Sequence, residues 1–259
     1  MVLEGRVALV TGGGRGIGRA IAIALGKRGA RVGLVARSPE QLAEAAAATE
    51  RAGGVAVVAV ADLADRERLA DALRRVTAAL GPVDILVNNA ALVEPAGPAI
   101  RLDPEEFARA LDVNLLAPVR LTMAVLPVML ERSWGRVINV STRAVVRPAT
   151  SLGLNAYTAS KSALEAHTIN LAAELGGTGV TSNVFRPVTV DTAMQEWLRK
   201  QPIEKVGTAL HDHFAGIHAE GRLVPPEQPA EVLVQVLAGD TNGQVVDGLS
   251  FHPCESGSS

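Results

Sequence analysis

Short apolar runs separated by longer amphipathic stretches recur along most of the chain. The short runs are rich in Val, Leu and Ile, and they are continuously apolar rather than alternating. That pattern is typical of strands buried on both faces of a parallel sheet. It predicts strands at residues 6–11, 31–36, 55–59, 83–87, 136–140 and 180–185, with a short last strand near 244–246.

The stretches between these runs have helical character, and several of them end in glycine, the usual stop residue. They predict helices at residues 17–29, 39–53, 65–80, 104–131, 156–176 and 227–238. Alternating strands and helices predict an α/β fold with a Rossmann-type doubly wound parallel sheet of about seven strands and helices on both faces. We expect residues 1–259 to form a single domain, with a looser segment at 188–226.

A glycine-rich loop, Thr11-Gly-Gly-Gly-Arg-Gly-Ile-Gly18, joins the first predicted strand to the first predicted helix. Glycines allow a tight turn and a close approach to a pyrophosphate, whose charge is favourable at a helix N-terminus. An ordinary glycine turn is the alternative. The position of the loop favours phosphate binding, with these candidate cofactor-binding residues: Gly12, Arg15, Gly16, Ile17 and Gly18.

The end of the second predicted strand indicates which dinucleotide is preferred. A site for NAD usually carries an acid there for the ribose 2′-hydroxyl, whereas this chain has Arg37. A guanidinium suits a 2′-phosphate, and Arg15 in the glycine loop is placed to reach the same group. The two arginines therefore predict NADP/NADPH as cofactor. The alternative is that both are solvated charges on loops.

The third and fourth predicted strands also end in polar residues, where such sheets bind ligands. Asp62 is placed to accept a hydrogen bond from an adenine amino group. Asn89 and Ala90, in an Asn-Asn-Ala-Ala sequence, follow the fourth strand. Asparagine also favours turns, so each of these residues alone is weak evidence.

The chain has one tyrosine, Tyr157, and Lys161 lies four residues after it. On a helix the two side chains share a face, and a nearby ammonium lowers the pKa of a phenol. Such a pair makes a usable acid–base group. A half-buried tyrosine beside a solvated lysine is the alternative.

Taken in order, these motifs together with Asn114, Ser141, Pro187 and Thr192 resemble the short-chain dehydrogenase/reductase family over nearly the whole chain. The resemblance implies hydride exchange between a nicotinamide and an alcohol or carbonyl. It implies catalytic roles for four residues: Asn114, Ser141, Tyr157 and Lys161. Tyr157 would be the proton donor, tuned by Lys161, which would also bind the nicotinamide ribose, and Ser141 would donate to the same substrate oxygen.

The resemblance also implies that Asn114 holds a water linking Lys161 to solvent. It places Pro187, Val190 and Thr192 along the nicotinamide. Residues 188–226 would form a lid over the substrate. The expected pocket residues are largely apolar and predict a small-molecule ketone or secondary alcohol without charge: Val93, Arg143, Val145, Leu152, Val188, Met194 and Trp197. Val188 replaces the glycine that the family usually has after Pro187, and Arg143 adds a cation near the expected mouth.

Composition narrows the class of partner. The net charge of −2 gives no reason to expect nucleic acid, and no apolar run approaches the ~18 residues that span a bilayer. Three histidines between 211 and 218 lack a ligand-spaced carboxylate or cysteine, so we expect no metal site. The single cysteine, Cys254, predicts no internal disulfide and a cytoplasmic protein. The resemblance implies a homodimer or homotetramer. A non-catalytic NADP-binding sensor of the same fold is the alternative function.

Overall fold

Seven parallel strands form one sheet in the computed structural model, which describes residues 3–248. Their order is β3-β2-β1-β4-β5-β6-β7, so the direction of winding reverses between β1 and β4. The predicted Rossmann-type sheet is therefore confirmed. The strands are β1 (Val7–Thr11), β2 (Arg31–Ala36), β3 (Val55–Val60), β4 (Ile85–Asn88), β5 (Gly135–Val140), β6 (Val180–Arg186) and β7 (Val245–Asp247).

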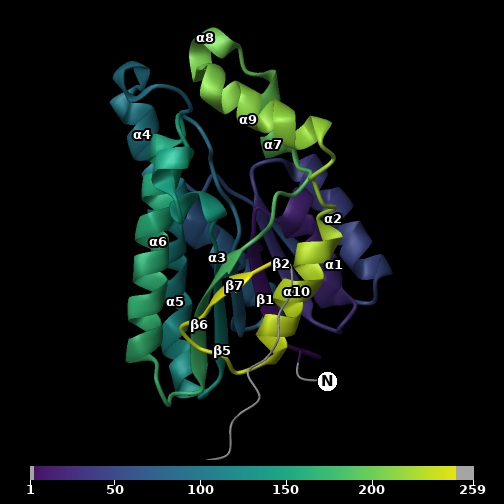
Figure 1. The fold of residues 1–259 in the computed structure, drawn as a ribbon. Helices are drawn as coiled ribbons and strands as arrows, with labels where there is room; N and C mark the ends of the chain where they lie inside the picture. Colours follow the sequence, from purple (N-terminus) through teal and green to yellow (C-terminus); the bar gives the residue numbers. More distant parts are fainter. Residues whose placement is uncertain (1–2, 249–259) are drawn as a thin grey trace, which may run out of the picture.

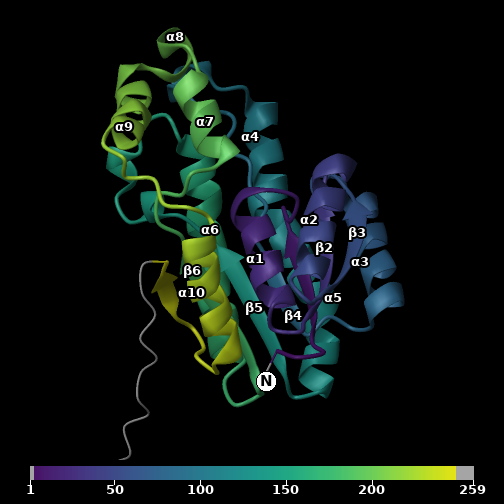
Figure 2. The same cartoon turned by 90° about the vertical axis from the view of Figure 1, so that its right-hand side faces the viewer.

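Helices cover both faces of this sheet (Figures 1 and 2). On one face α1 (Gly16–Gly26), α2 (Pro39–Arg51) and α10 (Glu227–Ala238) bury their apolar sides in a common core. On the other face α3 (Arg66–Leu80), α5 (Ala117–Glu131) and α6 (Asn155–Glu174) do the same. Because the central strands face a core on each side, β1, β4 and β5 are buried at every position, which explains their mainly apolar sequences; Arg136 and Asn139 of β5 are buried polar exceptions.

Helix starts are fixed by capping residues that follow the strands. Ser38 accepts a hydrogen bond from the backbone of Gln41 at the start of α2, and Asp65 caps α3 in the same way. Asp103 caps α4 (Pro104–Leu111), which has proline in its first turn. These caps place the helix N-termini near the carboxyl ends of the strands.

The predicted helix over 104–131 is not one regular helix. It consists of α4, a π-helical turn η2 (Asp112–Leu116) and α5. The periodicity of apolar residues could not show this, because a single wide turn barely changes the pattern. Such turns often occur at functional sites, and this one contains Asn114.

The segment Pro104–Glu131, which comprises α4, η2 and α5, is by length and composition the one candidate membrane span among residues 3–248. Charged residues interrupt this segment, so the expectation that no apolar run approaches ~18 residues is not contradicted. Core helices of globular proteins pass the same test, and nearly half of this window is buried against the sheet and its neighbours.

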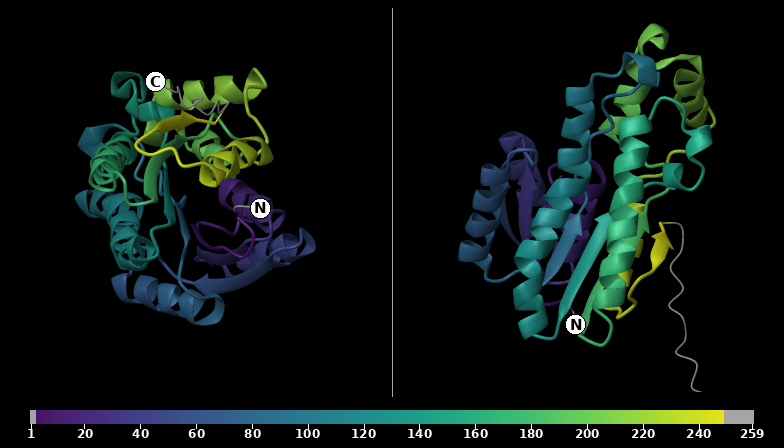
Figure 3. Two further views of the ribbon diagram at one scale, coloured as in Figure 1. Left: turned by 90° about the horizontal axis from the view of Figure 1, so that it is seen from below. Right: turned by 90° about the vertical axis from the view of Figure 1, so that its left-hand side faces the viewer.

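The looser segment folds into three short helices above the carboxyl edge of the sheet: α7 (Ala193–Lys200), α8 (Ile203–Val206) and α9 (Thr208–Ala219). Figures 1 and 3 show them standing clear of the strands. Backbone hydrogen bonds from Asp191 to Val224 and from Val224 to Thr189 join the two ends of the segment. Short 3-10 helices complete the loops, η1 (Ala99–Arg101), η3 (Arg143–Val145) and η4 (Pro148–Thr150). Cys254 lies outside the described residues.

Candidate active site

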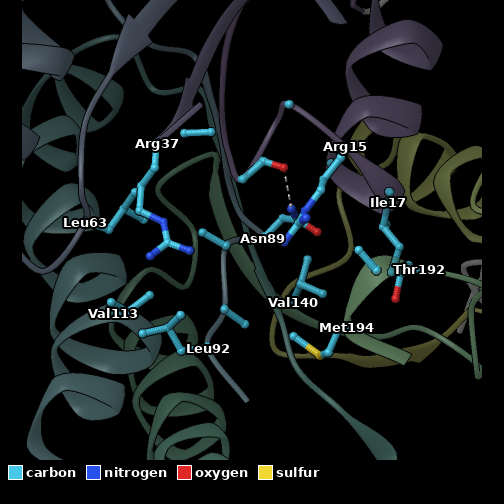
Figure 4. A pocket seen from close by; sticks show the side chains of 18 of the residues that line it. Arg15, Ile17, Arg37, Leu63, Asn89, Leu92, Val113, Val140, Thr192 and Met194 are labelled. Carbon is cyan, nitrogen blue, oxygen red and sulfur yellow. Dashed lines mark hydrogen bonds between the residues drawn. The ribbon is translucent and has the colours of Figure 1, made fainter. Parts of the chain in front are cut away.

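A cleft of about 370 Å³ opens at the carboxyl edge of the sheet, where the winding reverses between β1 and β4 (Figure 4). This is the position where open α/β sheets bind their ligands. Fifteen of the predicted site residues line it: Gly12, Arg15, Gly16, Ile17, Gly18, Arg37, Asp62, Asn89, Ala90, Ser141, Tyr157, Lys161, Pro187, Thr192 and Met194.

The glycine loop between β1 and α1 needs its glycines for two different reasons. Gly12 and Gly16 have positive φ angles of 65° and 53°, which favour glycine. At Gly18 the reason is space, since an added Cβ would lie 2.3 Å from the carbonyl oxygen of Gly12. No side chain caps the first turn of α1, so its backbone N–H groups remain available to an anion.

Arg15 and Arg37 carry exposed side chains on the wall of this cleft (Figure 4). Within residues 3–248 neither guanidinium has a hydrogen bond or an ion pair. Two free cations beside an uncapped helix N-terminus fit a phosphorylated ligand, and Ser38 and Gln41 add polar groups to the same wall.

Asp62 lies on the cleft wall with both carboxylate oxygens engaged. One accepts a hydrogen bond from the Ala64 backbone at 3.0 Å, and the other accepts one from Arg109 at 2.6 Å. Burial opposes ionisation, but these two donors hold the pKa of Asp62 below its usual value. Contact with an adenine amino group stays a prediction, and Asp62 would have to make it with a remaining lone pair.

Asn89 and Thr11 fasten the glycine loop to the end of β4. The side-chain amide nitrogen of Asn89 donates to the carbonyl oxygens of Thr11 at 2.9 Å and Gly12 at 3.4 Å. The hydroxyl of Thr11 accepts hydrogen bonds from the backbones of Asn89 and Ala90. Asn89 therefore shapes the loop through its donors, in addition to lining the cleft.

Ser141, Tyr157 and Lys161 meet at the cleft, as predicted. Ser141 follows β5 directly and is 2% exposed, and its hydroxyl oxygen has no hydrogen-bond partner among the described residues. An unpartnered buried hydroxyl is costly unless a ligand uses it. It is therefore suited to donate to an oxygen atom that enters the cleft.

Burial dominates the ionisation of both groups of the tyrosine–lysine pair. It raises the pKa of Tyr157 to about 12, opposed by a hydrogen bond with Thr142. It lowers the pKa of Lys161 to about 8, opposed by the charge of Glu165. The ammonium of Lys161 donates to the carbonyl oxygen of Val140 at 2.7 Å.

The expected lowering of the Tyr157 pKa by Lys161 is therefore wrong for the protein by itself. Burial raises the pKa of Tyr157, and no effect of the Lys161 charge on it is resolved among the described residues. Sequence spacing could place the two groups on one face of α6, but it could not supply their degree of burial.

Asn114 lies behind the cleft in the π-helical turn, and its side chain is fully buried. Its amide nitrogen donates to the Leu92 carbonyl oxygen at 2.8 Å and to the Ser160 hydroxyl at 3.0 Å. Its carbonyl oxygen accepts from the Leu92 backbone at 2.7 Å. Since both amide hydrogens are used, a relay water at Asn114 would have to donate to one of its oxygen atoms, and that role stays a prediction. The side chain joins η2, the Leu92 loop and α6.

Several predicted pocket residues lie elsewhere. Val93 is buried in a lid cluster, defined as Val93, Ala96, Leu154, Leu198, Val206, Leu210, Phe214 and Ile217. Trp197 packs on the outside of this cluster, together with Tyr157 and Met194. Met194 lines the cleft, whereas Val93 and Trp197 do not, and their expected roles in the substrate pocket stay predictions.

The loop after β5 turns other predicted residues outward. Arg143 is mostly exposed and pairs with Asp247 on β7 at 3.6 Å. Val145 lines a separate hollow on the outer side of α6, and Leu152 is 60% exposed. None of the three lines the cleft of the described structure, and their expected roles in a substrate pocket stay predictions.

Val188 and Val190 follow β6 but do not line the cleft of the described structure. Val190 is buried and forms an isolated parallel bridge with Val224. The expected contact of Val190 with a cofactor stays a prediction. Whether Val188 alters specificity stays a prediction.

Several cleft residues were not predicted by position. Ser38 and Gln41 belong to the start of α2, and Leu63 follows Asp62. Val113 precedes Asn114, and Ala193 follows Thr192. Most of these residues are sequence neighbours of predicted ones. Leu63, Val113 and Ala193 are apolar, and the sequence cannot tell whether an apolar residue lines a cleft or belongs to the core. Among residues 3–248 no cluster of histidine, cysteine and acidic side chains could hold a metal ion.

Comparison with known proteins agrees with this geometry. A family model described as short chain dehydrogenase matches residues 6–203. A short chain dehydrogenase of Pseudocercospora fijiensis is 40% identical over 195 residues, covering 74% of this chain and 62% of that protein. The chain therefore spans less than two thirds of that relative.

Two further matches cover nearly the whole chain. The 3-oxoacyl-[acyl-carrier-protein] reductase FabG of Pseudomonas aeruginosa is 37% identical over 241 residues, covering 93% of this chain and 92% of that protein. The crystal structure of a single-residue variant of actinorhodin polyketide ketoreductase with NADPH superposes with a TM-score of 0.83 at 31% identity, covering 96% of this chain and 98% of that one.

Proposed function

The chain belongs to the short-chain dehydrogenase family, and on that premise we propose that it is an NADPH-dependent carbonyl reductase, and in reverse a secondary alcohol dehydrogenase, for hydrophobic ketones. One observation carries the proposal. A buried, unpartnered Ser141 hydroxyl lies beside Tyr157 and Lys161 in a cleft that also holds two unpaired arginines. Ser141 and Tyr157 are suited to a substrate oxygen that gains negative charge, and the two arginines are suited to a phosphate.

The roles follow from the atoms that each residue presents. The nicotinamide, when bound, supplies the hydride that adds to the carbonyl carbon. Tyr157 gives its phenolic proton to the carbonyl oxygen, and the hydroxyl of Ser141 donates a hydrogen bond to the same oxygen as it gains charge. Lys161, with one proton on the Val140 carbonyl, keeps two donors for the ribose and for stabilising the tyrosinate. In oxidation the proton moves in the opposite direction.

NADPH rather than NADH is supported by the free guanidinium groups of Arg15 and Arg37 and by the lack of an acid after β2. The actinorhodin polyketide ketoreductase variant, which shares this fold, was solved with NADPH. A hydrophobic ketone is supported by the apolar side chains beside Tyr157, which are Leu92 and Met194 in the cleft and the lid cluster behind them.

We also propose a homo-oligomer. The outer sides of α5 and α6 expose several large apolar side chains: Leu116, Met123, Leu130 and Ile169. Buried nitrogens of Arg120 and His167 on the same helices have no hydrogen-bond partner within the described residues. A second copy of the chain would cover both features. Light scattering after size exclusion should give a molar mass that is a multiple of 26.9 kDa. Met123 is 64% exposed, and Met123→Glu should reduce that molar mass.

The activity is tested by following NADPH absorbance with a panel of aromatic and aliphatic ketones. Tyr157→Phe should abolish turnover and leave NADPH binding, because it removes only the phenolic hydroxyl. Lys161→Met should also abolish turnover and should in addition weaken NADPH binding, whereas Lys27→Met, a matched change at the far end of α1, should do neither. Undiminished turnover in Tyr157→Phe would refute the mechanism. Tight NADPH binding without turnover of any carbonyl would instead favour the sensor function.

A further inference from the structure

Glu165 and Arg186 form a largely buried ion pair beside the catalytic residues. The guanidinium donates two parallel hydrogen bonds to the carboxylate, from Nε to Oε1 at 2.8 Å and from Nη2 to Oε2 at 2.5 Å. The side chains are only 13% and 19% exposed. A buried ion pair often adds little net stability over an apolar pair, so its position calls for another explanation.

The pair connects the two elements that form the cleft around the nicotinamide. Glu165 lies one helical turn after Lys161 and two turns after Tyr157, so the three residues share a side of α6. Arg186 ends β6 and directly precedes Pro187, which lines the cleft. The two hydrogen bonds of this ion pair therefore connect α6, which carries the acid–base groups, to β6, which leads into the lid.

The carboxylate of Glu165 is also the counter-ion of Lys161. Burial lowers the pKa of Lys161 and the charge of Glu165 raises it. Arg186 in turn offsets the charge of Glu165, which raises the pKa of the guanidinium. No direct effect of Arg186 on Lys161 is resolved among the described residues, so Arg186 would act on Lys161 through the Glu165 carboxylate.

Other charged side chains on elements packed against α6 are engaged elsewhere. Arg109 binds Asp62, Asp112 of η2 lies 3.8 Å from Arg120, and Arg143 of η3 pairs with Asp247 of β7. The exception is Asp247, whose charge also raises the pKa of Arg186, after the larger effect of Glu165. Arg136 of β5 donates to backbone carbonyls at the opposite end of the sheet. Within residues 3–248, Glu165 is the one group whose charge has a resolved effect on Lys161.

We propose that Glu165 and Arg186 are positioning residues that together set the protonation of Lys161 and hold its helix against β6. Removing the carboxylate should make Lys161 lose its proton at lower pH. Removing the guanidinium should leave an unneutralised carboxylate and move the loss to higher pH. A purely structural pair would give shifts of one sign, or none.

Only four lysines occur in the chain, so the ionisation can be measured directly without cofactor or substrate. Protein labelled with ¹³C at lysine Cε should give four signals, and Lys161→Met identifies the one that titrates near pH 8. We expect Glu165→Gln to lower this midpoint, and Arg186→Gln to raise it, by about one pH unit each, given a charge roughly one helical turn away in a partly screened site. Arg186→Lys, which keeps the charge, should change it little.

Lys27, Lys200 and Lys205 serve as internal controls, and their midpoints should not move. Shifts of the same sign in both variants, or no shift, would overturn the proposal. If Glu165→Gln fails to fold, the contrast between Arg186→Gln and Arg186→Lys still decides, because only the former removes charge. The kinetic consequence rests on the proposed function: the high-pH limit of kcat/KM for ketone reduction should follow the NMR midpoints. Absence of turnover would fault that function and leave the NMR result standing.

Discussion

Replacing Arg37 with alanine should separate the two nicotinamide cofactors. Arg37 is exposed on the cleft wall, and no side chain within residues 3–248 holds its guanidinium. Its charge is nevertheless felt at Asp62, where it lowers the carboxyl pKa after the larger effects of burial, Ala64 and Arg109. The guanidinium is thus free to bind a 2′-phosphate without first breaking an ion pair.

The expected size follows from the bonds lost. Hydrogen bonds to charged groups contribute about 1.5–3 kcal/mol, which corresponds to a roughly 10- to 150-fold rise in the Kd for NADPH. NADH has no 2′-phosphate, so its Kd should change little. Fluorescence titration of both cofactors measures the two constants directly.

Arg51→Ala is the matched control, since it removes the same charge from an exposed arginine in the last turn of α2, away from the cleft. It should leave both constants unchanged. Arg15→Ala should also weaken NADPH binding selectively. Equal losses for NADPH and NADH in Arg37→Ala would refute the assignment of the 2′-phosphate site.

Three further outcomes are expected. Gly18→Ala should weaken NADPH binding and cost about 1–3 kcal/mol of stability, measured by denaturant unfolding, because its Cβ would lie 2.3 Å from the Gly12 carbonyl oxygen; unchanged stability would contradict this close packing. Ser141→Ala should lower kcat roughly 10²- to 10³-fold while leaving Tm nearly unchanged, since the hydroxyl has no partner to lose within the described residues; a large fall in Tm would show a structural role. The stability of the parent protein should rise by at most about 3 kcal/mol between about pH 8 and pH 10. Over this range the unfolded chain still binds the proton that buried Lys161 has lost in the folded protein. Lys161→Met should be more stable at pH 7 and should lack that rise; the same pH dependence in both proteins would contradict the low pKa.

The sequence predicted the sheet well because a parallel strand buried on both faces carries apolar side chains at most of its positions. It also predicted most of the cleft, since glycine loops and polar residues at the ends of parallel strands converge at one edge whatever the details of packing. Arg37 directly follows β2, so its place at the edge of the sheet follows from the end of that strand. Tyr157 lies on the same face of a helix as Lys161 because the two are four residues apart.

The predicted pocket residues that do not line the cleft belong to segments without such a constraint. Arg143 and Val145 follow β5 by only a few residues, but Arg143 pairs with Asp247 and Val145 lines a separate hollow. Val93 and Trp197 have the apolar character of a pocket wall, yet the lid uses them for its own core. Sequence cannot distinguish these fates, because a core and an apolar pocket select the same side chains.

The amino-acid sequence by itself determined the fold, the family and the position of the acid–base pair, because these depend on periodicity and on spacing along single elements. Only the tertiary structure decided the chemistry of that pair. It buried Tyr157 and Lys161 deeply enough to move both pKa values, and it brought Arg186 from another strand to neutralise Glu165. Burial and ion pairing across elements depend on distances between segments far apart in the chain, which no local pattern encodes.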